Sequence, residues 1–212
     1  RLGLLRERQA ALIDGIGIDL EEFKPAPLPT LPTFLLIARL LASKGIAEYV
    51  DAARMVKAKY PEAKFRLVGW IDEHPEAVRA TDLQAWIEEG IIDFLGRLDD
   101  VRPAIADCSV YVLPSHHEGL PRTVLEAMAM GRAIVTTDAP GCRETVVPGK
   151  NGLIVPVGDA AALAAAMESF LQRRELIERA GSASRALAVR RFDVHAVNRD
   201  ILRIMRLDGS LA

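Results

Sequence analysis

Charged side chains occur in two short stretches of the sequence, each directly after an apolar run. The first stretch contains Arg39 and Lys44, which offer a planar guanidinium fork and a mobile point charge to phosphate oxygens. The second contains Gly119 and Leu120 and leads into an expected helix at about Pro121. The first amides of a helix lack helical acceptors and its amino end is positive, so they can cradle phosphate oxygens. Together the two stretches predict a diphosphate site.

Two acids flank this expected helix start. Glu118 precedes the helix at the mouth of the site, and Glu126 lies inside it on the face that it shares with Arg122 and Thr123. Carboxylates accept paired hydroxyl donors well, so one acid would suit a sugar and the other a ribose. Two acids around a diphosphate are therefore typical of a nucleotide-sugar site.

Short apolar runs alternate with amphipathic stretches, which is typical of βα units around a parallel sheet. We expect strands at residues 34–38, 64–68, 91–95, 109–113, 133–137 and 153–156. We expect helices at residues 46–56, 82–89, 102–107 and 122–130, then a long alanine-rich helix that begins at Ala160 and is capped by Asp159. After it the chain is expected to be helical to its end.

This pattern predicts an α/β fold, a Rossmann-like doubly wound parallel sheet of six strands in the order 3-2-1-4-5-6 with C-terminal helices. In that order the first and fourth strands are neighbours where the winding reverses, and ligands bind beyond the carboxyl ends of the strands there. The two charged stretches follow these two strands. They would therefore face one crevice.

The 212 residues amount to one and a half domains at about 150 residues per domain. We expect one domain at residues 33–192. Residues 1–32 would be the remnant of a preceding domain and an interdomain linker, because prolines stiffen residues 13–32. Residues 193–212 would form a final helix whose apolar stripe must pack on another surface. Because residue 1 is Arg, the start resembles a cut inside a longer chain.

Composition excludes several function classes. A formal net charge of −2 gives no global basic field for nucleic acid or an anionic bilayer. Cys108 and Cys142 are the only cysteines, too few for a disulfide framework or a Cys-rich metal site, which favours a reducing compartment and a cytoplasmic location. No apolar stretch approaches the roughly 18 residues that a membrane span needs, and no signal peptide is visible.

The combined motifs resemble those of retaining glycosyltransferases of family 4, and the chain is similar to the C-terminal, donor-binding half of their GT-B fold. The resemblance covers nearly the whole chain. It rests on Arg39-Leu40 with Lys44-Gly45, on Pro114-Ser115, on Glu118-Gly119-Leu120-Pro121 through Leu125-Glu126-Ala127-Met128, on Gly131, on Gly141 with Glu144, on Asn151-Gly152 and on Val155-Pro156. Gly17-Ile18-Asp19 and Phe23-Lys24-Pro25 stand where that family joins its two domains. The resemblance also implies that the helix at residues 193–212 returns toward the missing N-terminal domain.

The resemblance implies a role for each site residue. Arg39 and Lys44 would bind the diphosphate of a UDP-sugar or GDP-sugar, Glu118 would contact the transferred sugar, and Glu126 would contact the ribose. Arg39, Lys44 and Glu118 are thus the candidate catalytic residues. The other candidate donor-binding residues are Gly45, Gly119, Leu120, Pro121 and Thr123, together with Gly96, Arg97 and Leu98, which would line the base pocket.

The family's reaction sets further expectations. Transfer with retention is explained by front-face attack while the leaving diphosphate is stabilised electrostatically, which needs no metal and no separate cofactor. The sequence contains no Asp-x-Asp. A saccharide or lipid-linked saccharide acceptor, as in bacterial polysaccharide or glycoconjugate synthesis, would bind the missing N-terminal domain, with peripheral membrane association at the inner face. The chain alone would bind donor without transferring sugar.

Some assignments stay open on the sequence alone. His116 and His117 lie at the expected cleft mouth, where they would either assist the reaction or orient the loop. Cys142 would be structural or would contact substrate, whereas Cys108 is expected to be a small buried hydrophobic residue. The alternative functions are a binding module without turnover and a GT-B epimerase or phosphorylase.

Overall fold

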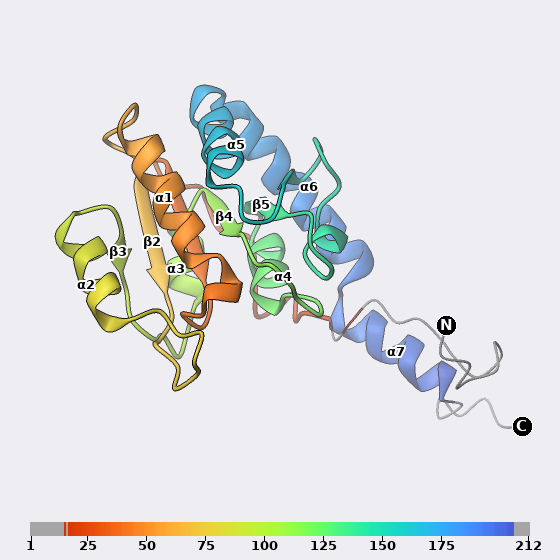
Figure 1. The fold of residues 1–212 in the computed structure, drawn as a ribbon. Coiled ribbons are helices and arrows are strands. Elements are labelled where there is room, and N and C mark those ends of the chain that lie inside the picture. The colour runs from red at the N-terminus through yellow and green to blue at the C-terminus, as the bar shows by residue number, and fades with distance from the viewer. Residues whose placement is uncertain (1–14, 16, 206–212) are drawn as a thin grey trace, which may run out of the picture.

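The computed structural model describes residue 15 and residues 17–205. It contains a six-stranded parallel sheet in the order β3-β2-β1-β4-β5-β6, with helices on both faces (Figure 1). The strands are β1 (Thr33–Ile37), β2 (Lys64–Val68), β3 (Asp93–Phe94), β4 (Val110–Leu113), β5 (Ala133–Thr137) and β6 (Gly152–Val155). The predicted fold class and strand order are confirmed.

The central strands are apolar throughout because both faces of the sheet are covered. In β1, Phe34 and Leu36 belong to one cluster of buried side chains. Leu35 and Ile37 point to the opposite face and belong to a second cluster. Successive side chains on a strand alternate between faces, so one five-residue run contributes to both halves of the core.

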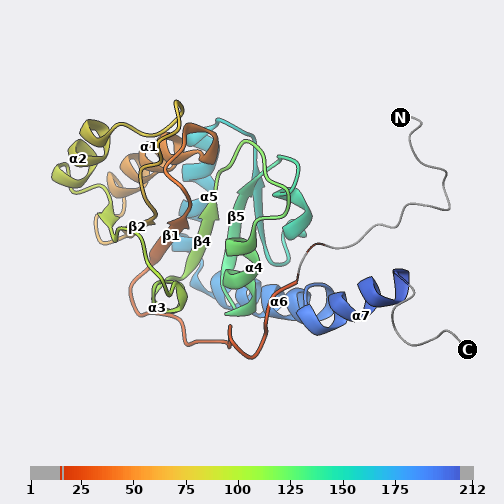
Figure 2. The ribbon, with the colours of Figure 1, turned by 90° about the horizontal axis from the view of Figure 1, so that it is seen from below.

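The helices form two layers. Those that contribute to the first cluster are α1 (Ile46–Lys57), α2 (Ala80–Glu88), α5 (Ala160–Gln172) and the first turns of α6 (Arg174–Arg191). Those that contribute to the second are α3 (Arg102–Ala106), α4 (Arg122–Ala129) and the latter part of α6. Short 3₁₀ turns η2 (Ala42–Lys44) and η3 (Arg143–Thr145) follow β1 and β5, and α7 (Val194–Ile204) comes last. Figure 2 shows the strands between these layers.

The sheet boundaries agree closely with expectation except at β3. We expected a strand over residues 91–95, but only Asp93 and Phe94 pair with β2. Gly90 and Gly96 both adopt positive φ, 70° and 69°, and these left-handed turns limit the extended segment at this sheet edge. The predicted cap of α5 is confirmed, because the Asp159 side chain accepts a hydrogen bond from the amide of Ala162 at 2.8 Å.

The proline-rich segment before β1 lies against the domain. Ile18 and Phe23 are buried in the second cluster. Arginines hold its carbonyl groups: Arg132 donates to Ala26 at 2.6 Å and to Pro27 at 3.2 Å, Arg174 to Pro29 and Thr30, and Arg185 to Phe23. The segment expected to be a linker is therefore fastened to this domain over residues 18–30. The expected remnant at residues 1–12 and the chain end after residue 205 lie outside the described residues.

The helix α7 projects away from the rest of the domain (Figures 1 and 2). Of its expected apolar stripe, Val197 is buried, while Ile204 is 47% exposed. No described helix is both long enough and apolar enough to cross a membrane.

Helix α6 passes close to the start of β5. A Cβ atom at Gly181 would lie 2.2 Å from the carbonyl oxygen of Gly131. We therefore expect Gly181→Ala to lower the free energy of unfolding by about 1–3 kcal/mol through overpacking, although alanine ordinarily stabilises a helix interior relative to glycine. Urea denaturation measures this change. The exposed neighbour gives the control, since Ser182→Ala should have no such cost; equal stability of both variants would contradict the close approach.

Candidate active site

Two loops meet beyond the carboxyl ends of β1 and β4. These strands are neighbours in the sheet, and the amide of His116 in the second loop donates to the carbonyl oxygen of Ser43 in the first at 2.9 Å. Gly45 adopts a φ of 69°, and a Cβ there would lie 2.2 Å from the carbonyl oxygen of Pro114. Only glycine fits this approach without strain. The predicted juxtaposition of the two charged loops is confirmed.

Lys44 and Glu118 form the central ion pair of this edge. Their Nζ and Oε1 atoms are 2.6 Å apart, and the two side chains are only 19% and 16% exposed. The hydroxyl of Ser115 donates to the same carboxylate oxygen at 2.8 Å. Limited exposure strengthens a charge-assisted hydrogen bond. The lysine ammonium and the acid are thus held in place by each other before any ligand is bound.

A pocket of about 200 Å³ lies at the carboxyl ends of β1 and β2. It is lined by Ile37, Ala38, Arg39, Val68, Gly69, Trp70, Arg97, Leu98, Val101 and Thr123. The guanidinium of Arg39 is half exposed and donates to Asp72 at 3.0 Å. The guanidinium of Arg97 lies 5.0 Å from the centre of the Trp70 ring, within the range of a cation–π contact. The pocket therefore combines an apolar interior with two cations and a planar aromatic ring.

Backbone contacts shape this pocket. A Cβ at Gly69 would lie 2.0 Å from the carbonyl oxygen of Ala38. The amide of Gly69 donates to the carbonyl oxygen of Gly96 at 2.9 Å. The ends of β1, β2 and β3 are thereby drawn together, and the residues that follow each strand form one wall.

The start of α4 forms another part of the site. Pro121 is the residue before the first helical turn, with a φ of −72°, as the position favours. The amides of Gly119 and Leu120 donate to no acceptor among the described residues. Gly141 packs against this loop, because a Cβ there would lie 2.2 Å from the carbonyl oxygen of Glu118. Free amides at a fixed helix start are suited to anion binding.

Glu126 is a buried acid one turn into α4. It is 6% exposed and accepts a hydrogen bond from the Nε of Arg122 at 3.0 Å. Burial raises the pKa of Glu126, and the bond from Arg122 opposes that effect. The predicted shared face of these two residues is confirmed, and Thr123 from the same turn lines the pocket.

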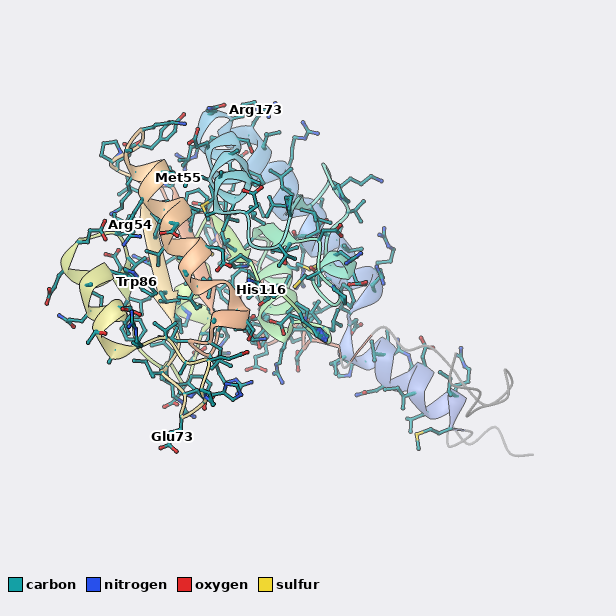
Figure 3. All side chains as sticks on the ribbon, in the orientation of Figure 1. Arg54, Met55, Glu73, Trp86, His116 and Arg173 are labelled. Atoms are coloured by element: carbon teal, nitrogen blue, oxygen red, sulfur yellow. The ribbon has the colours of Figure 1, made fainter. Side chains whose placement is uncertain are left out.

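The residues left open by the sequence have separate places. His116 lies beside the first turn of α1, where its Nε2 is 2.9 Å from the Oε1 of Glu48 (Figure 3). Cys108 and Cys142 are both buried, and burial raises the pKa of each thiol, that of Cys108 to about 12. Across the described ranges, no group of three or more His, Cys, Asp or Glu residues is placed to hold a metal ion.

The structure brings most of the predicted residues to one edge of the sheet. Arg39, Arg97, Leu98 and Thr123 share the pocket, whereas Lys44 and Glu118 form the central ion pair. Gly45 contributes by its close packing, because its own amide already donates to the carbonyl oxygen of Ala42 at 2.9 Å. The remaining predicted residues, Gly96, Gly119, Leu120, Pro121 and Glu126, lie in the loop after β3 and at the start of α4.

Sequence reasoning missed four residues at this edge. Trp70 and Asp72 follow β2, and their signal was the same rule that pointed to the loops after the first and fourth strands. Ser115 and Glu48 hold Glu118 and His116, respectively. Partners of this kind are set by side-chain distances that no sequence pattern contains.

Curated relatives match this chain over most of its length. The N,N'-diacetylbacillosaminyl-diphospho-undecaprenol alpha-1,3-N-acetylgalactosaminyltransferase of Campylobacter jejuni is 32% identical over 186 residues, which cover 81% of this chain and 48% of that protein. The phosphatidyl-myo-inositol mannosyltransferase of Mycolicibacterium smegmatis is 34% identical over 198 residues, 89% of this chain and 50% of that protein. The chain spans about half the length of these relatives.

Solved structures share the fold. Sucrose-phosphate synthase of Thermosynechococcus elongatus aligns with a TM-score of 0.79 and 26% identity over 90% of this chain and 50% of that one. The C-terminal domain of LpcC, a group 1 glycosyl transferase family protein of Francisella tularensis, aligns with a TM-score of 0.72 and 22% identity over 84% of this chain and 100% of that one. The likeness to the second is one of fold alone.

The family assignment rests on sequence as well as fold. Residues 31–173 match the model of the family described as glycosyl transferases group 1. This match includes β1 to β6 and every residue of the candidate site. Taken with the relatives and the strand order predicted for one half of a GT-B fold, it shows that the chain belongs to the group 1 glycosyl transferases.

Proposed function

We propose that this chain is the donor-binding half of a retaining glycosyltransferase that uses a nucleotide-diphosphate sugar. The observation that carries the proposal is the meeting of Arg39, the Lys44–Glu118 pair and the free amides of Gly119 and Leu120 at one edge of the sheet. Two cations and a helix start can hold a diphosphate. Two acids beside them can accept sugar hydroxyls.

Each part of the donor has a matching part of the site. The diphosphate would bind Arg39, Lys44 and the start of α4. The nucleobase would enter the pocket that Trp70, Arg97 and Leu98 line, and the ribose hydroxyls would donate to Glu126. The transferred sugar would contact Glu118. Supporting this order, Arg39 lines the pocket and Lys44 follows it in the same loop after β1, where it pairs with Glu118.

The proposed chemistry follows from charge. As the bond between the anomeric carbon and the diphosphate oxygen breaks, negative charge grows on the leaving diphosphate. Arg39 and Lys44 are fixed cations that stabilise this charge without moving, which is the usual source of large rate enhancements. The acceptor hydroxyl would attack from the same face and pass its proton to the departing oxygen, so configuration is retained. No metal ion takes part in this proposal.

The acceptor would bind outside this chain. The chain spans about half the length of the curated relatives, so we propose that the other half of a two-domain enzyme holds the acceptor and that this chain alone binds donor without turnover. Two relatives are named for acceptors that carry undecaprenol diphosphate or phosphatidylinositol. A saccharide or lipid-linked saccharide at the cytoplasmic face of a membrane is the matching proposal, as in polysaccharide or glycoconjugate synthesis.

Nucleotide titration tests the donor site directly. Among UDP, GDP and ADP, at least one should bind the 212-residue chain in calorimetry, and Arg39→Ala should weaken its affinity at least about tenfold because a charged hydrogen bond is lost. Arg54 in the last turn of α1 bonds Glu89 and Asp51 instead. Arg54→Ala is thus the control and should leave affinity unchanged. No binding of any nucleoside diphosphate would refute the proposed function.

Glu118→Gln separates the sugar contact from the diphosphate contact. Without the carboxylate, Lys44 loses its partner at 2.6 Å and becomes more available to phosphate. We expect the affinity for the bare nucleoside diphosphate to hold or rise, while the added affinity of the nucleotide sugar falls at least about fivefold. Calorimetry with both ligands gives this ratio. Glu62→Gln, at an exposed position, is the control; a variant that loses both affinities equally would argue against the sugar role.

The proposed contact between Glu126 and the ribose should make donor affinity depend on pH. Burial raises its pKa above the ordinary value of 4.5, and the carboxylate is the form that accepts ribose hydroxyls. Donor affinity should therefore fall as pH decreases, beginning at a higher pH than an ordinary glutamate would cause. A nucleotide sugar is the suitable ligand, since both phosphate groups of its diphosphate diester stay ionised across this range and its charge does not change. Titrations in a pH series measure the fall; Glu126→Gln should remove it, and an unchanged profile in that variant would exclude Glu126.

A further inference from the structure

A second pocket lies at the amino ends of the strands, away from the candidate active site. It has a volume of about 210 Å³ and is lined by Gly149, Lys150, Gly152, Leu153, Ser169, Phe170, Arg173, Leu176, Arg179 and Ala180. Gly152 and Leu153 are the first residues of β6. Figure 3 shows Arg173 at the top of the domain, well above His116. None of the residues proposed for the donor takes part in this pocket.

The floor of the pocket is apolar and continuous with the core. Phe170 is 2% exposed and belongs to the first cluster of buried side chains, against which Leu153 and Leu176 pack. These side chains come from the end of α5, the start of β6 and the first turn of α6. A floor made by three packed elements is rigid, so the hollow is a preformed one of the kind that ligands occupy.

Three cations line the same pocket. Lys150 comes from the turn before β6, Arg173 from the junction of α5 and α6, and Arg179 from α6. None of the three side chains makes an ion pair or hydrogen bond within the described residues. No carboxylate lines the pocket. Glu178 lines an adjoining hollow that shares Lys150 and Arg179, yet it pairs with neither.

Other cationic side chains near this pocket do have partners, unlike the three that line it. Arg174, the next residue after Arg173, donates to the carbonyl groups of Thr30 and Pro29. Lys59, which follows the end of α1, donates to the carboxylate of Glu168 in α5 at 2.8 Å. Like charges that converge without a counter-charge repel one another, and the repulsion is relieved when an anion binds among them. Three unpaired cations over an apolar floor therefore favour an anion with an apolar part.

The segments that bear the cations are fixed. Asn151 is buried, and its side chain accepts from the amide of Val147 at 2.7 Å and donates to the carbonyl oxygen of Thr145 at 3.0 Å. This bonding holds the turn that presents Lys150. The clamp made by Arg174 fixes the α5–α6 junction that presents Arg173. A ligand would thus meet a site that needs little backbone rearrangement.

We propose that this pocket binds a phosphate group that carries a small apolar substituent. The phosphate oxygens bond Lys150, Arg173 and Arg179, and the substituent packs on Phe170, Leu153 and Leu176. Arginine forks and a lysine ammonium are the side chains that recognise phosphate best. A phosphomonoester in solution and the headgroup region of an anionic phospholipid share this chemistry.

Two probes distinguish the two sources of phosphate. Phenyl phosphate, titrated calorimetrically into the 212-residue chain, represents the free ligand, with inorganic phosphate as the comparison that lacks the apolar part. Sedimentation with phosphatidylglycerol vesicles, against phosphatidylcholine vesicles, represents the lipid. Binding of phenyl phosphate in preference to inorganic phosphate supports a small ligand. Binding to phosphatidylglycerol vesicles without phenyl phosphate binding supports the lipid.

Two double variants test whether the probe binds in this pocket. Arg173→Ala with Arg179→Ala removes two exposed cations of the pocket and should weaken binding of the effective probe at least about tenfold. Arg190→Ala with Arg199→Ala removes two exposed cations elsewhere and should leave that binding within about twofold. Nucleoside diphosphate affinity should be unchanged in both, which keeps this test separate from the proposed function. Equal loss in the two double variants, or no binding of either probe by the parent chain, would overturn the proposal.

Discussion

The close approach of the loops after β1 and β4 is the constraint on which the candidate active site depends. It exists because the two strands are adjacent, and it is fixed by the bond from the His116 amide to Ser43 and by the lack of space for any side chain at Gly45. The pairing of Lys44 with Glu118 follows from this approach. Without it, a basic loop and an acidic loop would be two separate solvated segments.

The two candidate binding regions differ in how their cations are compensated. At the carboxyl ends of the strands, Lys44 and Arg39 already have carboxylate partners, so the proposed diphosphate would replace one set of oxygens with another. At the amino ends, the cations of the second pocket have no such partners among the described residues. The net charge of −2 does not distinguish paired cations from unpaired ones. Charge balance over a whole chain says nothing about where each cation is neutralised.

Much of the fold follows from local patterns. Alternating apolar and amphipathic stretches were enough to predict the strand order, and Asp159 was recognisable as a helix cap. The brevity of β3 and the packing of residues 18–30 were not, because both depend on tertiary contacts: glycine turns at Gly90 and Gly96, and arginines distant in sequence that bond proline-segment carbonyls. In the site, residue types and spacing predicted Glu118 and Glu126. Trp70 and Asp72 were missed because the rule for strand ends was applied only to the first and fourth strands, whereas Ser115 and Glu48 depend on side-chain distances.

The buried guanidinium of Arg132 has a mechanical meaning. It is 0% exposed, its bonds reach Ala26 and Pro27, and burial lowers its pKa. Together with the bonds from Arg174 and Arg185, it fastens the segment before β1 at several points along its length. A pull applied to this segment from upstream would first load the bonds between Ile18 and the junction of α6 and α7. It would then load the bonds made by Arg185 and Arg132 before it reached β1 and the loop that follows it. The site is in this sense insulated from tension in the chain that leads to it.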